Sequence, residues 1–465
     1  MRAKEIKTFS CLLMLLGLLF LASSCSEDSN LGTTSNDYCY IKSVVLGNVK
    51  RKVELRDRRG QLISTTNTSF TGSNFAMTIN LRDNTIENRD SLPYGSQISR
   101  VIVSITFDGS MLAYREKGSD AEWTAYNATD SLDLTKPLEL YLTSNDKQSS
   151  RIYTFKVNVH QQEGDSLYWK QCESEVEQLA GLEEMKAFSM NDKLMVLGKK
   201  TSDIILAERS SIEAEGTWEE ALTTGLPTTT DLQTLRQQDG NYYLSTTDGS
   251  IFSSVDAKDW QQVGTTYSAG LTLVEKTANY FYAISEGKLL RSTDAESWEE
   301  DQLDTEDTML PTSEIRVLSV QQANGNNRII MVGQREGSNN AAVWNKMWNE
   351  SEPEAEAEWI YFPISPDNLI PCPRLQYLNL MSYDGKCLAF GGASEDASHK
   401  ALDAMYFSQD YGITWRASNE LHLPIDLEGT EGCVTSTVDK NNFIWIITNA
   451  QVWRGRLNRL GFAQQ

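Results

Sequence analysis

Few side chains of this sequence have the type and spacing that metal chemistry requires. Its 465 residues include only three histidines, His160, His399 and His422, which lie far apart in the chain. A site that needs three imidazoles at one metal ion is therefore not expected. The seven cysteines are scattered and form no C-x-x-C pair, so they indicate neither a zinc site nor a disulfide framework. We expect no metal and no other cofactor.

One segment combines aromatic and acidic side chains. Trp344 and Trp348 lie within residues 336–358, and alternating glutamates follow them: Glu350, Glu352, Glu354, Glu356 and Glu358. The acids lack the Asn, Asp and Gly turn spacing of a calcium loop, which favours a solvated acidic loop. Aromatic rings exposed on a loop can bind sugar rings or protein partners. Trp344 and Trp348 are therefore candidate ligand-binding residues. The alternative is that both pack against the edge of a sheet.

The acidic composition constrains the partner but does not identify a catalytic site. The chain has 64 Asp and Glu against 42 Lys and Arg, a formal net charge of -22. This balance repels phosphate backbones and disfavours nucleic-acid binding. Glycoside hydrolysis needs two carboxylates at a defined separation, and so many acids form chance pairs without identifying one. We predict no catalytic residue and expect a protein that is not an enzyme.

The first residues predict a secretion signal. Basic residues precede an apolar run over residues 11–21, and small residues follow before Cys25. This order is that of a secretory signal peptide over residues 1–24, which is too short for a stable membrane span. The segment Leu-Ala-Ser-Ser-Cys that ends at Cys25 resembles the bacterial lipobox, in which the cysteine is lipid-modified. Several acyl chains on Cys25 would anchor the mature chain stably. An ordinary signal peptide is the alternative.

The residues after Cys25 indicate the membrane surface on which the anchored protein is expected. Ser26-Glu27-Asp28 resembles the acidic export signal that Bacteroidetes place after the lipidated cysteine of surface lipoproteins. Residues 25–37 are polar and without periodicity, which indicates a flexible tether. The resemblance implies a lipid-anchored protein of the cell outer membrane that faces the exterior.

Residues 38–163 have the pattern of a domain of short strands. Apolar and polar residues alternate over residues 101–107 and 153–159, and further strands are expected at 40–46, 75–81 and 138–142. Such a segment predicts a β-sandwich. It resembles the immunoglobulin-like modules at the N-termini of Bacteroidetes surface lipoproteins, although it lacks an inter-sheet Cys…Trp…Cys pattern.

A second domain, residues 164–465, repeats one unit six times. In each unit a polar turn precedes a compact apolar strand, as where Asp384-Gly385-Lys386 precedes residues 387–392. Such turns between apolar runs predict hairpins, and hairpins repeated at this period predict a β-propeller. The turns lie at residues 191–193, 239–241, 278–279, 324–327, 384–386 and 439–442.

One unit contains a distinctive turn motif. Residues 408–415 read Ser-Gln-Asp-Tyr-Gly-Ile-Thr-Trp and resemble the Asp-box of sialidase-like propellers, with weaker copies at 254–260 and 292–298. In such a turn the Asp caps backbone amides and the Trp packs between sheets. We therefore expect structural roles for Ser408, Asp410, Gly412 and Trp415. The Arg-Ile-Pro motif of sialidases is absent from the sequence. A Gly-Gly pair at 391–392 also makes the repeat similar to kelch propellers.

The two ends of the repeat predict how the ring closes. Trp169 precedes the first unit with no strand of that unit before it, whereas the sixth unit, from Cys433 to about residue 460, has no such tryptophan. If Trp169 supplies the outer strand of the last sheet, both ends of the domain join one blade and the ring has only protected edges. This arrangement predicts six four-stranded blades. A seventh blade in the long fourth unit is the alternative.

Three Asp-Ser-Leu segments resemble the acceptor motif of Bacteroidetes O-glycosylation. The resemblance implies modification of Ser91, Ser131 and Ser166.

Together these features favour a monomeric, surface-exposed outer-membrane lipoprotein of all-β fold. Its propeller would bind a glycan or a protein partner without catalysis. The competing hypothesis is a glycan-active hydrolase with its site in the propeller funnel, where the loops of the blades converge. A third hypothesis is a structural scaffold within a larger surface complex.

Overall fold

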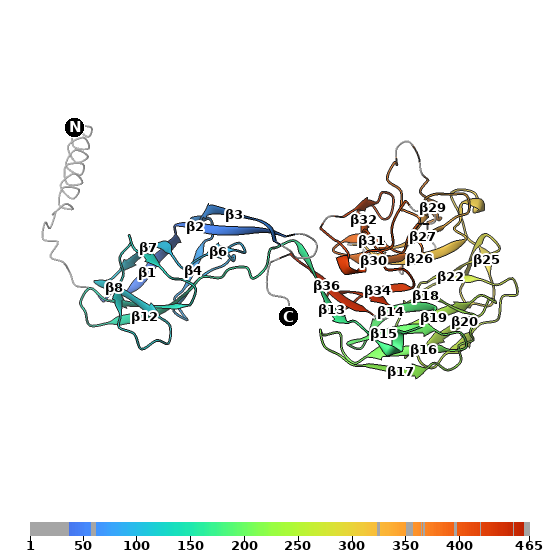
Figure 1. Ribbon diagram of the computed structural model, residues 1–465, viewed down its shortest axis with the longest axis horizontal. Coiled ribbons are helices and arrows are strands. Elements are labelled where there is room, and N and C mark those ends of the chain that lie inside the picture. Colours follow the sequence, from blue (N-terminus) through green and yellow to red (C-terminus); the bar gives the residue numbers. More distant parts are fainter. Residues whose placement is uncertain are drawn as a thin grey trace, which may run out of the picture. The chain divides into compact units, whose positions relative to one another are not determined.

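The computed structural model (Figure 1) describes residues 37–56, 62–322, 326–349, 357–363, 365, 368–394, 398–418, 420–449 and 451–459. Cys25 and the predicted signal and tether up to residue 36 lie outside these residues. The protein is all-β, and its short 3₁₀ helices include η1 (Gly72–Asn74), η2 (Glu177–Leu179), η3 (Asp307–Met309) and η5 (Ile425–Leu427). None of the described helices is long and apolar enough to cross a membrane.

The chain divides into two compact units, which are described separately. The first comprises Met1–Glu54 and Thr65–His160, and the second comprises Leu55–Ser64 and Gln161–Gln465.

Two sheets of the first unit share one hydrophobic core. The smaller sheet has the order β1 (Tyr40–Leu46), β7 (Val101–Asp108), β10 (Ser131–Leu132). The larger has the order β4 (Met77–Asn80), β5 (Thr85–Asn88), β12 (Ser150–Lys156), β11 (Leu138–Thr143), β8 (Met111–Glu116), β9 (Thr124–Ala125). Along β7, buried and exposed residues alternate as the period-two pattern predicts. Val103 of β7 packs with Leu140 and Phe155 of the larger sheet in this core.

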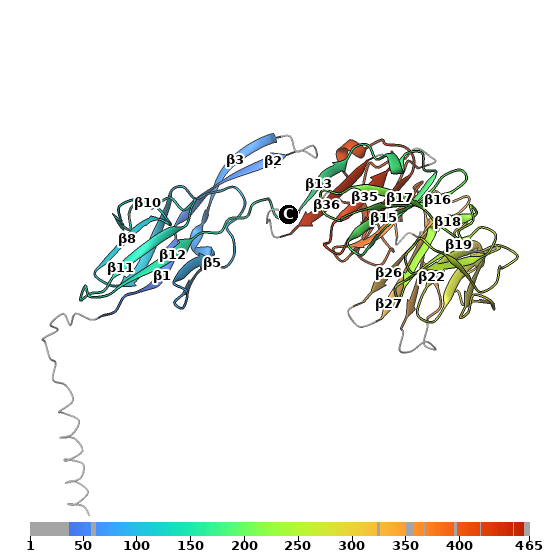
Figure 2. The ribbon, with the colours of Figure 1, turned by 90° about the horizontal axis from the view of Figure 1, so that it is seen from below.

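A third sheet of three strands has the order β3 (Leu62–Thr71), β2 (Asn48–Arg56), β6 (Ser96–Gln97). Figure 2 shows β2 and β3 side by side as a long hairpin. Strand β3 forms an edge of this sheet, and nearly every described side chain of it is exposed.

The second unit is a β-propeller domain. Its described residues form six four-stranded sheets, each listed here from the innermost strand outward. They are β14 (Glu184–Met190), β15 (Lys193–Lys199), β16 (Ile204–Arg209), β17 (Trp218–Leu222); β18 (Thr230–Gln238), β19 (Asn241–Thr246), β20 (Ile251–Ser254), β21 (Gln261–Val263); β22 (Thr272–Lys276), β23 (Phe281–Ser285), β24 (Lys288–Ser292), β25 (Glu299–Glu300); β26 (Ser313–Gln321), β27 (Asn327–Gln334), β28 (Ala342–Trp348), β29 (Ile360–Tyr361); β30 (Asn379–Tyr383), β31 (Lys386–Phe390), β32 (Tyr406–Ser408), β33 (Arg416–Ala417); and β34 (Val434–Val438), β35 (Ile444–Thr448), β36 (Val452–Asn458), β13 (Ser166–Glu173).

The predicted hairpins are present where the polar turns lie. Asp239 and Gly240 have φ values of +50° and +79°, and Asp384 and Gly385 have +51° and +68°. A two-residue hairpin turn with positive φ at both positions matches the twist of its strands, and Asp-Gly suits that geometry. The strand after each turn is the second of its sheet, and strands such as β23 and β35 are buried along their whole length. They are buried because a neighbouring sheet covers each of their two faces.

The last sheet contains both ends of the propeller domain. Strand β13 pairs antiparallel with β36, with Trp169 opposite Gly455, and the two strands lie together in Figures 1 and 2. The prediction that Trp169 supplies the outer strand of this sheet is therefore confirmed. Glycine is required opposite the tryptophan, because a Cβ atom at Gly455 would lie 2.4 Å from Trp169 Cε3. The first and last sheets also share a core, in which Val196 packs with Trp445.

Candidate functional site

Trp344 and Trp348 do not form an exposed platform. Both lie in β28 and are buried, with 0% and 7% of their surface exposed. They pack in the core between the sheets of β22–β25 and β26–β29, and Trp344 Nε1 donates to Met309 O at 3.1 Å. The prediction that these residues bind a ligand from a loop is wrong, and the alternative of packing against a sheet is correct. The segment is a strand covered by its neighbouring sheet, so neither ring can reach a ligand.

The structure describes part of the acidic segment and all three serines of the Asp-Ser-Leu segments. Among the described residues, no group of three or more His, Cys, Asp or Glu could hold a metal ion. Glu358 is exposed, and the remaining alternating glutamates lie outside the described residues. Ser131 is exposed in β10, whereas Ser91 and Ser166 are half-buried. The leucine that follows each of these serines is buried in a core.

The Asp410 turn is held by its own hydrogen bonds. Asp410 Oδ1 accepts from Thr414 N at 2.9 Å and from Ser408 Oγ at 2.7 Å, and Asp410 Oδ2 accepts from Thr414 Oγ1 at 2.6 Å. Ser408 Oγ also accepts from Gly412 N at 2.8 Å. Gly412 has a φ of +92°, and the buried Trp415 donates its Nε1 to Gly412 O at 2.8 Å. The side-chain oxygens of Ser408, Asp410 and Thr414 are thus engaged in hydrogen bonds within the turn.

The two weaker copies of the motif have the same architecture. Asp256 Oδ1 accepts from the backbone N–H groups of residues 258 and 259, and Asp294 Oδ1 accepts from those of residues 296 and 297. Ala257 and Ala295, each with a φ of +60°, occupy the left-handed position that Gly412 takes in the complete motif. In these turns, as in the complete motif, the Asp side chain caps backbone amides and therefore has a structural role.

Polar side chains bridge every junction between neighbouring innermost strands. The bridging hydrogen bonds are Gln233 Nε2 to Met185 O (2.9 Å), Arg236 Nε to Val274 O (2.5 Å), Ser319 Oγ to Glu275 Oε2 (2.5 Å), Arg316 Nε to Leu378 O (2.7 Å), Asn379 Nδ2 to Val434 O (3.2 Å) and Ala187 N to Thr435 Oγ1 (2.9 Å). The bridges are spread along the strands, and those that involve Met185, Leu378, Asn379, Val434 and Thr435 lie at or next to the start of a strand. The starts of the innermost strands therefore meet at one end of the ring.

This end of the ring holds a set of charged and amide side chains, here called the axial cluster: Glu184, Lys186, Asp231, Gln233, Arg236, Glu314 and Arg316. Two of its carboxylates lie close together. Glu184 Oε1 and Asp231 Oδ1 both accept from the Gln233 backbone N–H, at 3.2 Å and 2.9 Å. The two oxygen atoms are separated by no more than the sum of these distances.

Lys186 brings an amine to the same place. It follows Glu184 by two positions on β14, so both side chains leave the strand on the same face. The side chain is half-buried, and its ammonium has no hydrogen-bond or ion-pair partner among the described residues. It interacts electrostatically with charged groups of β14, β18 and β26, namely Arg236, Arg316, Asp231 and Glu184.

The surroundings shift the pKa values of Lys186 and Glu184 so that the neutral form of each side chain is favoured. Burial lowers the pKa of the Lys186 ammonium to about 7, and the charges of Arg236 and Arg316 act in the same direction. Burial also raises the pKa of the Glu184 carboxyl to about 7, and the nearby Asp231 charge acts with it. Near neutral pH both groups exchange protons readily, so each can donate or accept a hydrogen bond. Shifted pKa values of this kind cluster at functional sites.

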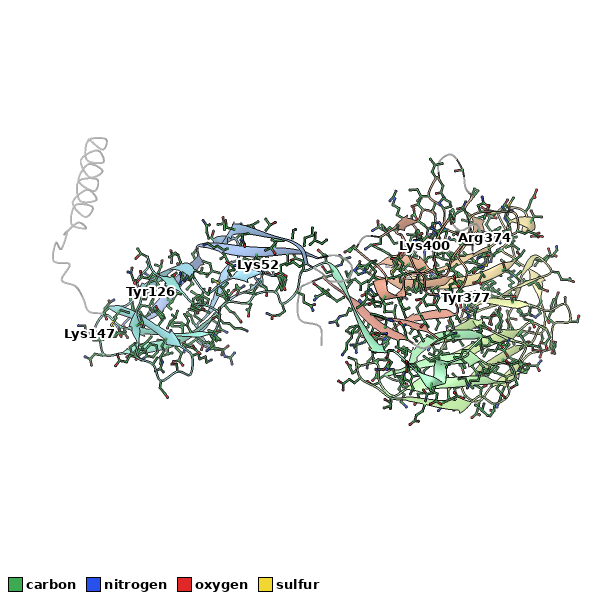
Figure 3. The ribbon with its side chains drawn as sticks, viewed as in Figure 1. Lys52, Tyr126, Lys147, Arg374, Tyr377 and Lys400 are labelled. Atoms are coloured by element: carbon green, nitrogen blue, oxygen red, sulfur yellow. The ribbon has the colours of Figure 1, made fainter. Side chains whose placement is uncertain are left out.

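An aromatic ring lies at the same end of the ring. Tyr377 immediately precedes Leu378 and β30, and it is labelled in Figure 3. It is 37% exposed and has a φ of +46°, a left-handed conformation that is unfavourable for a bulky residue. Its carbonyl accepts from Asn379 Nδ2 at 2.9 Å, and Glu314 Oε2 accepts from Leu378 N at 3.3 Å. This end of the ring therefore combines the donors and acceptors of the axial cluster with the exposed ring of Tyr377, which suits a hydroxylated or peptidic ligand.

Sequence reasoning did not find the axial cluster. Glu184-x-Lys186 and Asp231-x-Gln233 look like the solvent-facing positions of ordinary half-buried strands. The available signal was their position, because each pair begins the strand before a predicted hairpin turn. In a propeller these strands are the innermost ones. The residues that look solvent-facing in the sequence therefore face the axis of the propeller.

The comparisons with known proteins agree with this architecture. The "DUF6242 beta propeller domain" matches residues 163–465, and the "Domain of unknown function (DUF6242) N-terminal domain" matches residues 44–157. The protein is thus a two-part all-β protein with a C-terminal propeller. The chain belongs to the DUF6242 family. No curated protein matches it.

Several solved structures resemble the propeller unit at low identity. YCF48 from Cyanidioschyzon merolae is 12% identical with a TM-score of 0.36, and the match covers 62% of this chain and 98% of that one. The GH93 alpha-L-arabinofuranosidase of Fusarium graminearum, solved with arabinobiose, is 11% identical with a TM-score of 0.39 over 63% and 99% of the two chains. A streptogramin B lyase is 11% identical with a TM-score of 0.34 over 63% and 98%. Likenesses this weak carry no conclusion about function.

Proposed function

We propose that this protein is a binding protein whose propeller takes a glycan or a protein partner at the axial cluster and does not change it chemically. The observation that carries the proposal is Lys186, an amine without a partner among the described residues, beside the carboxylates of Glu184 and Asp231. Leaving a half-buried charge unpaired is unfavourable for folding. A ligand that pairs with these groups gives a reason for their presence.

The N-terminal residues support a location for this binding protein. The lipobox-like segment that ends at Cys25 and the acidic residues Glu27 and Asp28 support a lipid-anchored location on the outside of the outer membrane of a Bacteroidetes-type bacterium. There it acts as a monomer, and its negative charge disfavours nucleic acid as a partner.

The proposal includes a specific architecture. The propeller has six blades of the Asp-box type with kelch-like features, supported by the six described sheets and by the pairing of β13 with β36. The N-terminal unit is an immunoglobulin-like sandwich, supported by the core that its two main sheets share.

A binding experiment with matched lysine variants tests the proposed function. The chain from residue 26 onward is assayed against immobilised host and plant glycans as wild type, Lys186→Met and Lys170→Met. Lys170 is the control because it is exposed on the outer strand β13. We expect a glycan whose binding falls about tenfold or more with Lys186→Met and is unchanged with Lys170→Met. Equal binding by both variants would contradict the proposal.

If no glycan binds, the protein-partner form of the proposal is tested by pull-down from intact cells. It requires a partner that is lost with Lys186→Met and retained with Lys170→Met. Retention by both variants, or capture of no partner, would refute this form as well.

One observation favours a second candidate function, a glycan-active hydrolase. Retaining glycosidases use two carboxyl groups a short distance apart, one of which has a raised pKa and acts as the acid. Glu184 and Asp231 accept from the same N–H, and the pKa of Glu184 is raised to about 7. Product release by the wild type that is abolished by Glu184→Gln, with binding retained, would establish this alternative over the first.

A further inference from the structure

The larger sheet of the first unit turns one face to solvent. Its buried face carries Ile86, Phe155, Leu140 and Leu112, which belong to the hydrophobic core. Side chains alternate between faces along a strand, so their sequence neighbours point outward. This outer face is independent of the axial cluster, since it belongs to the other unit.

A row of polar side chains crosses this outer face. The pairing registers place Asn80 of β4 opposite Thr85 of β5, Thr85 opposite Thr154 of β12, Thr154 opposite Glu139 of β11, and Glu139 opposite Arg115 of β8. Neighbouring strands lie about 4.8 Å apart, so the row of five residues is about 19 Å long. The hydroxyl groups of Thr85 and Thr154 form no hydrogen bonds within the described part of the chain.

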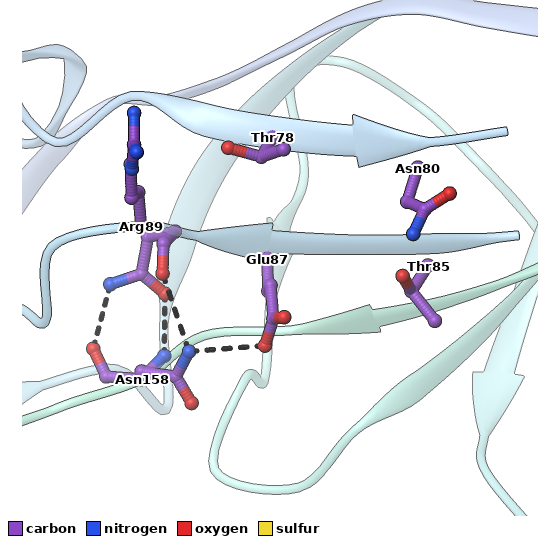
Figure 4. Close-up of a pocket in the computed structure, with 7 residues that line it drawn as sticks. Thr78, Asn80, Thr85, Glu87, Arg89 and Asn158 are labelled. Carbon is purple, nitrogen blue, oxygen red and sulfur yellow. Dashed lines mark hydrogen bonds between the residues drawn. The ribbon is translucent and has the colours of Figure 1, made fainter. Parts of the chain in front are cut away.

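The row begins in a hollow of about 480 Å³ at β4 and β5, shown in Figure 4. Its lining is mainly hydroxyl and amide side chains, those of Thr78, Asn80, Thr85, Asn88 and Asn158. The floor is fixed, because Asn158 N donates to Asn88 Oδ1 at 2.6 Å and Asn88 Nδ2 donates to Asn158 O at 2.8 Å. One acidic and one basic side chain, Glu87 and Arg89, also line the hollow.

The other end of the row carries aromatic rings. Trp123 and Tyr141 lie with ring centroids 5.2 Å apart, and the Arg115 guanidinium lies 4.3 Å from the Trp123 ring. Arg115 Nε also donates to Glu139 Oε2 at 2.8 Å, which fixes the guanidinium in place. Tyr141 and Trp123 are half-buried, and Tyr141 stands opposite the exposed Ile152. An apolar ring surface with polar groups beside it suits one face of a sugar ring.

We propose that this outer face is a second binding site, which takes a neutral oligosaccharide lying across the strands from the hollow at Thr78 to the ring of Tyr141. Hydroxyl and amide side chains exchange hydrogen bonds with sugar hydroxyls. The Glu139 charge is paired with Arg115, and the hollow holds one charge of each sign, so the surface selects no charged ligand. A peptide strand would instead add along the edge strand β4 and pair with its backbone, at right angles to this row.

The test measures binding of the chain from residue 26 onward to neutral and anionic hexasaccharides in solution. The neutral probes are cellohexaose, mannohexaose and xylohexaose, and the anionic probe is hexagalacturonate. Thr78→Trp fills the hollow, and Tyr141→Ala removes the ring at the far end. Thr106→Trp is the matched control, because Thr106 is exposed on β7 of the other sheet. Thermal melting of each variant verifies its fold.

We expect at least one neutral probe to bind, and its affinity to fall about tenfold or more with Thr78→Trp and with Tyr141→Ala. Thr106→Trp should leave this affinity unchanged. If Tyr141→Ala does not fold, Thr78→Trp alone decides. The proposal fails if no neutral probe binds, if only hexagalacturonate binds, or if binding is insensitive to Thr78→Trp. Binding that is lost only with Lys186→Met would assign the sugar to the propeller and also overturn it.

Discussion

Replacing Asp410 with alanine tests whether the motif at residues 408–415 is structural. Its carboxylate accepts hydrogen bonds from Thr414 N, Thr414 Oγ1 and Ser408 Oγ, at 2.9 Å, 2.6 Å and 2.7 Å. Burial alone would raise the pKa of Asp410, but these hydrogen bonds outweigh it and lower the pKa below 3.8. The carboxylate is therefore an acceptor that the fold has arranged, and it should contribute measurably to stability.

The magnitude follows from what the alanine variant leaves behind. A hydrogen bond to a charged group contributes about 1.5–3 kcal/mol, and a donor left buried without an acceptor costs about 1–3 kcal/mol. Ser408 Oγ still accepts from Gly412 N, and the Thr414 hydroxyl can turn toward water. The Thr414 N–H is held in place by the backbone of the turn and loses its acceptor. We expect Asp410→Ala to lower the free energy of unfolding by about 3 kcal/mol, and Asp410→Asn by about half of that, because the amide oxygen keeps one acceptor.

Denaturant unfolding followed by tryptophan fluorescence measures this loss. Of the 11 tryptophans, all but Trp123 belong to the propeller unit, so the signal reports that unit. Asp426→Ala is the matched control, since Asp426 is exposed in η5 and should change stability by less than about 0.5 kcal/mol. A value for Asp410→Ala that equals the control would refute the structural role. Glycan affinity per folded molecule should be unchanged, and its loss would reassign Asp410 to a binding site.

Further predictions concern the axial cluster, ring closure and location. Lys186→Met should raise the free energy of unfolding by about 1–2 kcal/mol at pH 7 in denaturant titrations, because it removes a half-buried ammonium without a partner among the described residues. Since the pKa of Lys186 falls from 10.5 to about 7 on folding, the wild type gains stability as pH rises through this range, so the advantage of the variant should vanish near pH 10.5. Asp410 has the opposite dependence, because its lowered pKa stabilises the fold above pH 3.8 and that stability is lost as pH falls, so wild type and Asp410→Asn should converge in acid unfolding curves. Gly455→Ala should lower the melting temperature with a cost of about 1–3 kcal/mol, because its Cβ would lie 2.4 Å from the Trp169 ring, which is fixed by a 2.7 Å hydrogen bond to His422 O. Protease added to intact cells should remove the protein, and full protection would place it on the inner side of the outer membrane.

The features that sequence reasoning predicted have local causes. The turn at Asp384-Gly385 needs two left-handed residues, and few residue pairs other than Asp-Gly provide them. The strand of Trp169 was predicted by counting tryptophans in the repeat. Trp169 is an extra tryptophan before the first unit, and the sixth unit lacks one. The Asp410 turn is formed by residues within eight positions of one another. In each of these features the interacting residues are close in the chain or repeat at a fixed interval.

The features that were missed depend on residues far apart in the chain. Trp344 follows Ala341-Ala342-Val343, an apolar run typical of a buried strand, but the acidic residues after it suggested an exposed loop. Its burial comes from the sheet of β22–β25, which contributes Val274 and Tyr282 to the same core. Lys186 likewise has its environment set by Arg236 and Arg316, from two other sheets. A single sequence without its fold does not indicate such neighbours.

The hydrogen bonds of the propeller separate two kinds of polar residue. Arg236, Arg316 and Asn379 bridge from one innermost strand to the next, so their donors are used in holding the ring together. Lys186 lies among them, yet it bridges nothing within the described residues. A polar group needed only for closure would take part in closure, as the others do, and an apolar side chain would fit the same space with less loss of solvation. The contrast between Lys186 and its neighbours is therefore the strongest reason to look for the ligand at the axis of the propeller.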